Sequence, residues 1–192
     1  MKKTSKPTTV KRPARSSKTP ANGKLRVVYS EQKLQKRVRE LADQINRDYK
    51  GKTLHVVGVL ENCFMFMADL IRAIEVPVYC YFLRTETKDV MRGGTATREI
   101  AYTPAVDAVG KNILLVEGIL QSGMTMDHLF RYFLGQNPTS VRTAMLIEKT
   151  DERKIDVPTD YVGFKTTGGF LVGYGLGYQG KFKNLPRVAT LG

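Results

Sequence analysis

Short apolar runs of strand length alternate along this chain with longer segments whose apolar residues recur at helical spacing. Residues 54–60 (LHVVGVL) and 112–116 (NILLV) are apolar almost throughout, a pattern typical of parallel strands buried on both faces. Residues 31–49 instead place apolar side chains three and four positions apart, behind Ser30 as a helix cap. Strands that alternate with helices in this way predict an α/β fold, with a mostly parallel sheet flanked by helices.

The remaining elements follow from the same patterns. A second helix is expected from Phe64, Met67, Ala68, Ile71 and Ile74, and a third from Met126, Leu129, Phe130, Phe133 and Leu134. Further strands are expected at 25–29, 76–83, 141–147 and 161–164. Residues 84–105 are polar and contain Gly93-Gly94, so they predict a mobile loop or a hairpin, with 99–102 as a candidate short strand.

The positive charge of the chain is concentrated at its N-terminus. The net charge is +13, and residues 1–24 hold eight basic side chains and three prolines but no acidic or aromatic residue. Such a segment cannot bury enough apolar surface to offset its chain entropy, so residues 1–24 are predicted to be a disordered basic tail on one domain, residues 25–192. Three roles stay open for the tail: solubility, organelle targeting, or binding nucleic acid by neutralising phosphates.

Composition excludes several classes of protein. With 42% hydrophobic residues the chain is not wholly disordered, and its two cysteines cannot form a disulfide scaffold. No apolar run approaches the roughly 20 residues needed to cross a bilayer. We therefore expect a cytoplasmic protein without a membrane partner, in which Cys63 and Cys80 are buried, reduced thiols.

In parallel sheets, ligands bind beyond the carboxyl ends of the strands. Four segments of this chain follow an expected strand and are candidates for the site: 61–63, 84–105, 117–125 and the region after Ile147.

Residues 113–126 (ILLVEGILQSGMTM) contain the strongest functional signal. An apolar strand leads to the acid Glu117 and then to a turn, Ser122, Gly123, Met124 and Thr125, that opens a helix. Such a turn presents free backbone N–H groups and two hydroxyls to one point, at the positive end of a helix dipole, and this arrangement suits a phosphate. The same residue types also simply cap helices, so the turn by itself leaves both interpretations open.

Together, the strand, the acid and the turn resemble the phosphoribosyl-pyrophosphate motif of type I phosphoribosyltransferases. The similarity to hypoxanthine-guanine phosphoribosyltransferases extends over about residues 25–190. It includes Leu60 with 66–70 (FMADL) for the first active-site loop, 147–150 (IEKT) for the base-reading strand end, and 161–164 (YVGF) with 170–178 (FLVGYGLGY) for the purine lid. The resemblance implies a type I fold with a small hood formed by the terminal segments, and a homo-oligomer.

The resemblance also implies roles for individual residues. Glu117 would face the ribose hydroxyls, and residues 122–125 would hold the 5′-phosphate. Lys149 would donate to the 6-oxo group of a purine, Phe170 would stack on the base, and the backbone of Leu171 would meet its edge. From the residues alone, Phe170 could equally belong to the core, and Lys149 could be a solvated charge at a strand end.

Three positions lack an acid that the family has. They are Gly118, Gln121 and Gly177. The family's acid at position 121 is thought to accept the purine N7 proton, and the one at position 177 helps to hold magnesium. Glutamine cannot act as a general base, and glycine offers no side-chain ligand, so both functions are expected to be weakened.

The positions expected to meet pyrophosphate also depart from the family. Glu61 and Asn62 replace a Lys-Gly pair, and Lys183 replaces an arginine. A carboxylate at position 61 would repel pyrophosphate, and Lys183 keeps the charge but loses the bidentate fork of arginine. Residues 84–105 contain no counterpart of the family's Ser-Tyr pair.

These observations predict a protein of the purine (hypoxanthine or guanine) phosphoribosyltransferase family. It would bind a purine nucleotide or base and phosphoribosyl pyrophosphate, with weak or lost turnover and with magnesium held mostly by the substrate. Two alternatives stay open: a non-catalytic purine-nucleotide sensor or assembly protein, and a nucleic-acid-associated protein that acts through residues 1–24.

Overall fold

The computed structural model describes residues 25–84, 86–92, 95–101 and 106–191, with residues 86–92 and 95–101 as backbone only. The predicted disordered tail, residues 1–24, lies outside the described residues. No helix in the described part of the chain combines the length and the apolar character needed to span a membrane.

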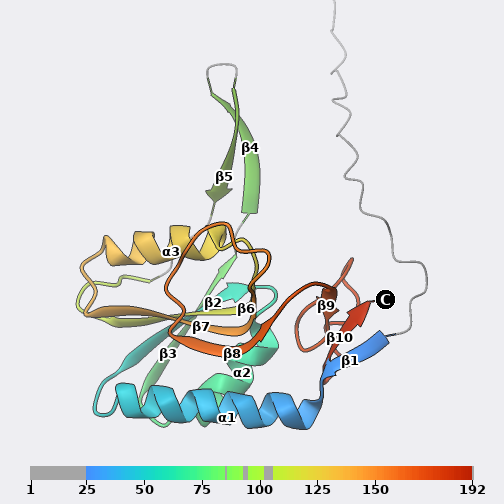
Figure 1. Cartoon of the computed structure of the whole chain (residues 1–192). Helices are drawn as coiled ribbons and strands as arrows, with labels where there is room; N and C mark the ends of the chain where they lie inside the picture. The colour runs from blue at the N-terminus through green and yellow to red at the C-terminus, as the bar shows by residue number, and fades with distance from the viewer. Residues whose placement is uncertain (1–24, 85, 93–94, 102–105, 192) are drawn as a thin grey trace, which may run out of the picture.

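A five-stranded, fully parallel sheet forms the centre of the molecule, as the sequence predicted (Figure 1). Its order is β3-β2-β6-β7-β8. The strands are β2 (Leu54–Leu60), β3 (Val78–Arg84), β6 (Asn112–Leu120), β7 (Ser140–Lys149) and β8 (Tyr161–Thr166). Because all of them run the same way, their carboxyl ends lie along one edge of the sheet.

Three helices cover the two faces of this sheet. Figure 1 shows α1 (Glu31–Asp48) and α2 (Phe64–Ala73) on one face and α3 (Met124–Leu134) on the other. Successive strand residues alternate between these layers: Val56 packs in the core with α1 and α2, whereas Val57 packs with α3. The predicted cap of α1 is confirmed, since the Ser30 side chain accepts a hydrogen bond from the Lys33 backbone N–H.

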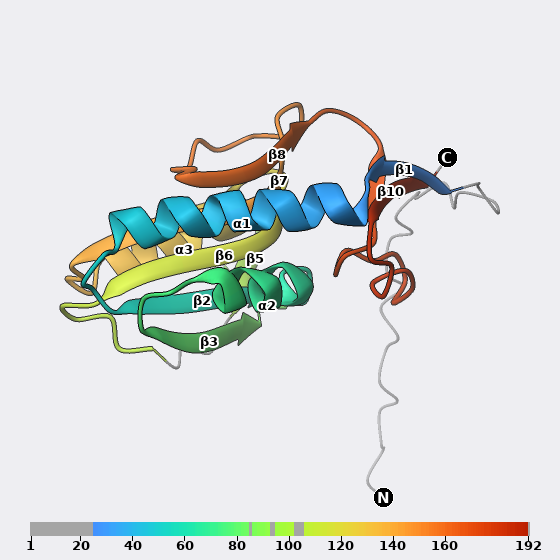
Figure 2. The ribbon, with the colours of Figure 1, turned by 90° about the horizontal axis from the view of Figure 1, so that it is seen from below.

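The terminal segments form the predicted hood. It is a three-stranded antiparallel sheet in the order β1-β10-β9, from β1 (Leu25–Tyr29), β9 (Phe170–Val172) and β10 (Val188–Leu191). Figure 2 shows the hood beyond the end of the sheet toward which the strands point. The hood therefore stands over the edge where parallel sheets bind ligands.

Residues 86–92 and 95–101 pair as the two strands of a hairpin, one of the two options that the sequence left open. β4 (Glu86–Arg92) pairs with β5 (Thr95–Ala101), and the ribbon projects away from the sheet (Figure 1). The strand expected at 99–102 begins earlier, at Thr95, and Tyr102 lies outside the described residues.

The expectation that Cys80 is buried is wrong, and not every residue that indicated a helix is buried. Phe64 and Ala68 are exposed, because α2 is apolar on more than one side and buries Phe66, Met67 and Leu70 instead. Leu134 ends α3 and is 54% exposed. Cys80 is exposed because β3 is the outer strand of the sheet, whereas Cys63 is buried as expected.

Candidate functional site

The turn between β6 and α3 has the geometry of an open anion cradle. β6 extends to Leu120, beyond the predicted end, and Gly123 then adopts φ 85°, a left-handed conformation that favours glycine. No side chain caps α3 at Gly123, and the backbone N–H groups of Thr125 and Met126 have no acceptor among the described residues. Those N–H groups are free to bind an anion at the positive end of the helix.

A pocket opens at this turn. Its lining includes Glu117, Gln121, Ser122, Gly123 and Thr125, so the structure brings together the residues expected to hold the ribose and the phosphate. Met124 does not line the pocket, and its side chain is 46% exposed. The Met124 N–H donates to the Ser122 hydroxyl at 3.4 Å, but simple helix capping does not account for the unpaired Thr125 and Met126 amides of a turn that faces a pocket.

The loop between β7 and β8 holds the turn in place. The backbone N–H groups of Lys154 and Ile155 donate to the carbonyl of Ser122 at 3.0 and 3.1 Å. A β-carbon on Gly123 would lie 2.7 Å from the Ile155 carbonyl oxygen, so only glycine permits this approach.

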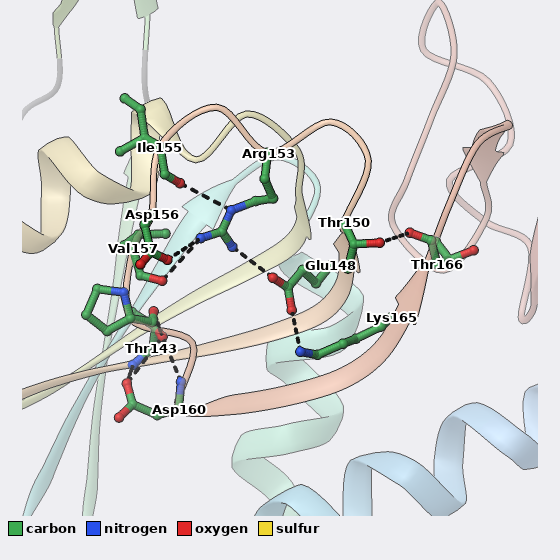
Figure 3. A network of polar contacts seen from close by, with 11 residues as sticks. Thr143, Glu148, Thr150, Arg153, Ile155, Asp156, Val157, Asp160, Lys165 and Thr166 are labelled. Carbon is green, nitrogen blue, oxygen red and sulfur yellow. Dashed lines mark hydrogen bonds and ion pairs between the residues drawn. The ribbon is translucent and has the colours of Figure 1, made fainter.

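Arg153 fixes the shape of this loop (Figure 3). Its guanidinium donates to the Glu148 carboxylate at 3.0 Å and to the backbone carbonyls of Ile155 and Val157 at 3.2 and 3.3 Å. Glu148 is only 7% exposed and lies 3.4 Å from the ammonium of Lys165. The sequence analysis missed Arg153 and Glu148; the one available signal was a dense run of charges, residues 148–154, directly after a buried strand.

A second pocket brings together the residues expected to read a base. Lys149, Phe170 and Leu171 line it with Gln121 and Asn62. Lys149 is 3% exposed, which excludes a solvated strand-end charge, and Phe170 is 47% exposed, which excludes a core residue. The Phe170 ring meets the edge of Tyr178, with 5.2 Å between centroids. Gln121 and Ile119 line both pockets, so the two are neighbouring parts of one cleft.

Glu152 does not itself line the base pocket but contacts two residues that do, Lys149 and Gln121, and the sequence analysis missed it. Its carboxylate accepts a hydrogen bond from the Lys149 ammonium and another, at 3.0 Å, from the Gln121 amide. Lys149 also donates to the carbonyl of Gly169 at 2.8 Å.

Glu117 is a carboxylate without a partner among the described residues. It stands between the core of β6 and the first pocket, and burial raises its pKa from 4.5 to about 7. The side chain is therefore neutral over part of the acidic range and suited to hydroxyl groups rather than to a second anion.

The three residues expected to meet pyrophosphate lie together near the cleft, but their charges compensate one another. The Glu61 carboxylate lies 3.3 Å from the Lys183 ammonium and 3.6 Å from the Arg84 guanidinium, and Lys183 also donates to the Asn62 amide oxygen at 3.4 Å. Arg84 was not among the expected residues. This arrangement offers an anion less positive charge than two free cations would.

Positions 118 and 177 have little room for a side chain. A β-carbon on Gly118 would lie 2.2 Å from the Asn62 carbonyl oxygen, and one on Gly177 would lie 2.8 Å from Cγ of Lys183. The adjacent space is thus filled by backbone at Gly118 and by a lysine stem at Gly177. Nowhere among the described residues do three potential metal-ligating side chains come together.

Comparisons with known proteins identify the family of this chain. The family model of the phosphoribosyl transferase domain matches residues 27–179. The hypoxanthine-guanine phosphoribosyltransferase of Dictyostelium discoideum is 34% identical over 169 residues, which cover 86% of this chain and 94% of that protein. The one from Aquifex aeolicus is 36% identical over 166 residues, covering 86% and 93%.

A solved structure gives the same result. A crystal structure of a hypoxanthine-guanine phosphoribosyltransferase from Bacillus anthracis superposes with a TM-score of 0.77 at 35% identity, and the match covers 90% of this chain and all of that one.

Proposed function

Since the chain belongs to the phosphoribosyltransferase family, and within it to the hypoxanthine-guanine phosphoribosyltransferases, we propose that it binds a 6-oxopurine nucleotide and phosphoribosyl pyrophosphate and interconverts them slowly. The observation that supports this most directly is that the two pockets form one cleft. The free amides of the α3 turn lie at one pocket, the buried ammonium of Lys149 lies at the other, and Gln121 lines both.

Each part of the nucleotide has a matching part of the cleft. The phosphate would lie on the Thr125 and Met126 amides and the Ser122 and Thr125 hydroxyls. The ribose hydroxyls would face Glu117. The base would lie against the half-exposed Phe170 ring, with Lys149 donating to its 6-oxo group and the Leu171 backbone at its edge.

The reaction would form a bond between N9 of hypoxanthine or guanine and C1′ of the ribose, while the bond from C1′ to pyrophosphate breaks. Chemistry of this kind depends on stabilising the charge that the leaving group gains. Here Glu61 competes for Lys183 and Arg84, which supports slow turnover.

Magnesium does not fit a cage made by this chain, because Gly118 and Gly177 supply no ligand and Glu61 is paired with cations. Any magnesium that takes part would be held by oxygens of the pyrophosphate donor.

A non-catalytic nucleotide-binding protein is the second candidate. The compensated charges around Glu61 favour it, since they weaken the pyrophosphate half of the cleft and leave the nucleotide half intact. We further propose a homo-oligomer, for which Tyr79 and Phe82, 56% and 51% exposed on the outer strand β3, offer an apolar surface. A cytoplasmic location and nucleic-acid binding by residues 1–24 stay predictions of the sequence.

Two measurements test the proposal. Calorimetry with inosine, guanosine and adenosine 5′-monophosphates should show binding of the 6-oxopurine nucleotides in preference to the adenine nucleotide, and no binding of any of them would end the proposal. An assay of nucleotide formation from hypoxanthine or guanine with phosphoribosyl pyrophosphate and magnesium, at high protein concentration, separates the two candidates: slow product formation supports the enzyme, and its absence supports the binding protein.

A further inference from the structure

A carboxylate from the β7–β8 loop contacts two polar groups that line the base pocket. Glu152 accepts hydrogen bonds from both Lys149, the last residue of β7, and Gln121, the residue after β6. Its position is set locally: its backbone N–H donates to the Lys149 carbonyl at 3.3 Å, and the next residue, Arg153, is held by Glu148. The side chain itself is 38% exposed, so it can turn toward a ligand without the loop moving.

The order of groups along the cleft indicates which side of a base would meet this carboxylate. Gln121 lines both pockets, so the Gln121 side of the base pocket faces the ribose and phosphate. In a purine, the ring nearer the ribose is the imidazole ring, and its N7 is adjacent to the 6-oxo group. A base whose 6-oxo group meets Lys149 would therefore direct N7 toward Gln121 and Glu152.

Transfer to N9 requires that the base lose a proton, because a free purine has one imidazole N–H and its nucleotide has none. The Gln121 amide cannot accept that proton. We propose that Glu152 is a catalytic residue that accepts it, an inference that rests on the proposed function.

The step is balanced as follows. The N7–H bond breaks and an O–H bond forms on the Glu152 carboxylate, while the electron pair of the N–H bond stays in the ring. N9 forms its bond to C1′, and the bond from C1′ to pyrophosphate breaks with its electron pair going to pyrophosphate. Lys149 keeps its acceptor on Gly169 while Glu152 moves to the base, so the ammonium does not lose all its partners. Among the described residues, the Glu152 carboxylate forms an ion pair with Lys149 and accepts a hydrogen bond from the neutral amide of Gln121.

The kinetic test uses single turnovers with protein in excess over hypoxanthine and with saturating phosphoribosyl pyrophosphate. The variant E152Q keeps the size and hydrogen-bonding capacity of the side chain but cannot accept a proton, so its rate should fall by about 10²- to 10⁴-fold. E152D should recover part of this loss. The matched control is E75Q, which removes one exposed carboxylate outside the cleft and should leave the rate unchanged.

A binding test does not depend on turnover. Free hypoxanthine carries the proton that Glu152 would accept, so its N7–H should donate to the Glu152 carboxylate, and the native chain should bind hypoxanthine about tenfold more tightly than 7-deazahypoxanthine, which has no N7. E152A should bind the two equally.

The outcomes separate the two proposals. An E152Q rate equal to or above that of the native chain, or an E152A that keeps the preference for N7, overturns the role of Glu152; in the second case Gln121 is the group on N7. A native chain that binds neither base and no purine nucleotide overturns the proposed function instead.

Discussion

The carbonyl oxygen of Asn62, in the loop after β2, lies 2.2 Å from the point that a β-carbon on Gly118 would occupy. The loop thus passes directly over β6, and position 118 has no room for a side chain. We expect G118A to lower the free energy of unfolding by about 1–3 kcal/mol, because either the loop or the strand has to shift. Thermal and denaturant unfolding measure this.

The matched control is G135A at the end of α3. A β-carbon there would meet nothing closer than 3.5 Å, and φ is −67°. This change should be neutral or slightly stabilising. Equal effects of the two substitutions would show that the Asn62 loop yields easily.

Arg153 should matter for both stability and phosphate binding. R153M leaves Glu148 buried without its closest partner, at a cost of about 3–5 kcal/mol, and it frees the loop that holds the Ser122 carbonyl. The affinity for inosine 5′-monophosphate should fall as well, which calorimetry measures. R72M, which removes an exposed pair with Asp69, should cost less than 1 kcal/mol and leave binding unchanged.

The double variant E148M/R153M distinguishes an unpaired charge from a general loss of packing. It should recover much of the stability that R153M loses, since no buried charge remains. If the double variant is less stable than R153M, the ion pair is not the cause.

Neutralising Glu61 should strengthen pyrophosphate binding. E61Q frees Lys183 and Arg84, and removing one charge at this distance in a solvated site is worth about 1 kcal/mol, or about fivefold in affinity. Calorimetry with pyrophosphate at low and high salt provides the measurement, and the gain should shrink as salt rises. Unchanged affinity at low salt would mean that Glu61 does not face the anion.

Glu117 should make the native chain less stable as the pH rises. Because burial raises its pKa from 4.5 to about 7, the folded state binds the proton more tightly than the unfolded state does, so stability falls between about pH 4.5 and 7. The loss attributable to this group is about 3 kcal/mol, since one pKa unit corresponds to about 1.4 kcal/mol. E117Q should lack it, so the difference in unfolding free energy between E117Q and the native chain should grow from pH 4.5 to pH 8. A difference that is constant over this range would mean that the carboxyl is hydrated.

The local patterns predicted most of the architecture. The apolar run 54–60 and the helical spacing of 31–49 correspond to β2 and α1 within one residue, because burial on both faces and burial on one stripe leave distinct periodicities. The local patterns could not show which face of α2 is buried, because its apolar residues lie on more than one side of the helix. They also could not show that Cys80 lies on an outer strand. The residues that line the cleft, including Gln121, Lys149 and Phe170, could be named in advance because they follow strands or match a family motif.

Sequence alone determined that this chain forms a parallel sheet in which a glycine-containing turn after one strand opens a helix, since strand and helix periodicity and turn composition are properties of neighbouring residues. Only the tertiary structure decided that Glu152 meets Gln121, that Glu61 is paired with Lys183, and that Asn62 excludes a side chain at Gly118. These partners lie far apart in the chain, and their contacts depend on how the strands align and how the loops pack across the edge of the sheet, which no local pattern encodes.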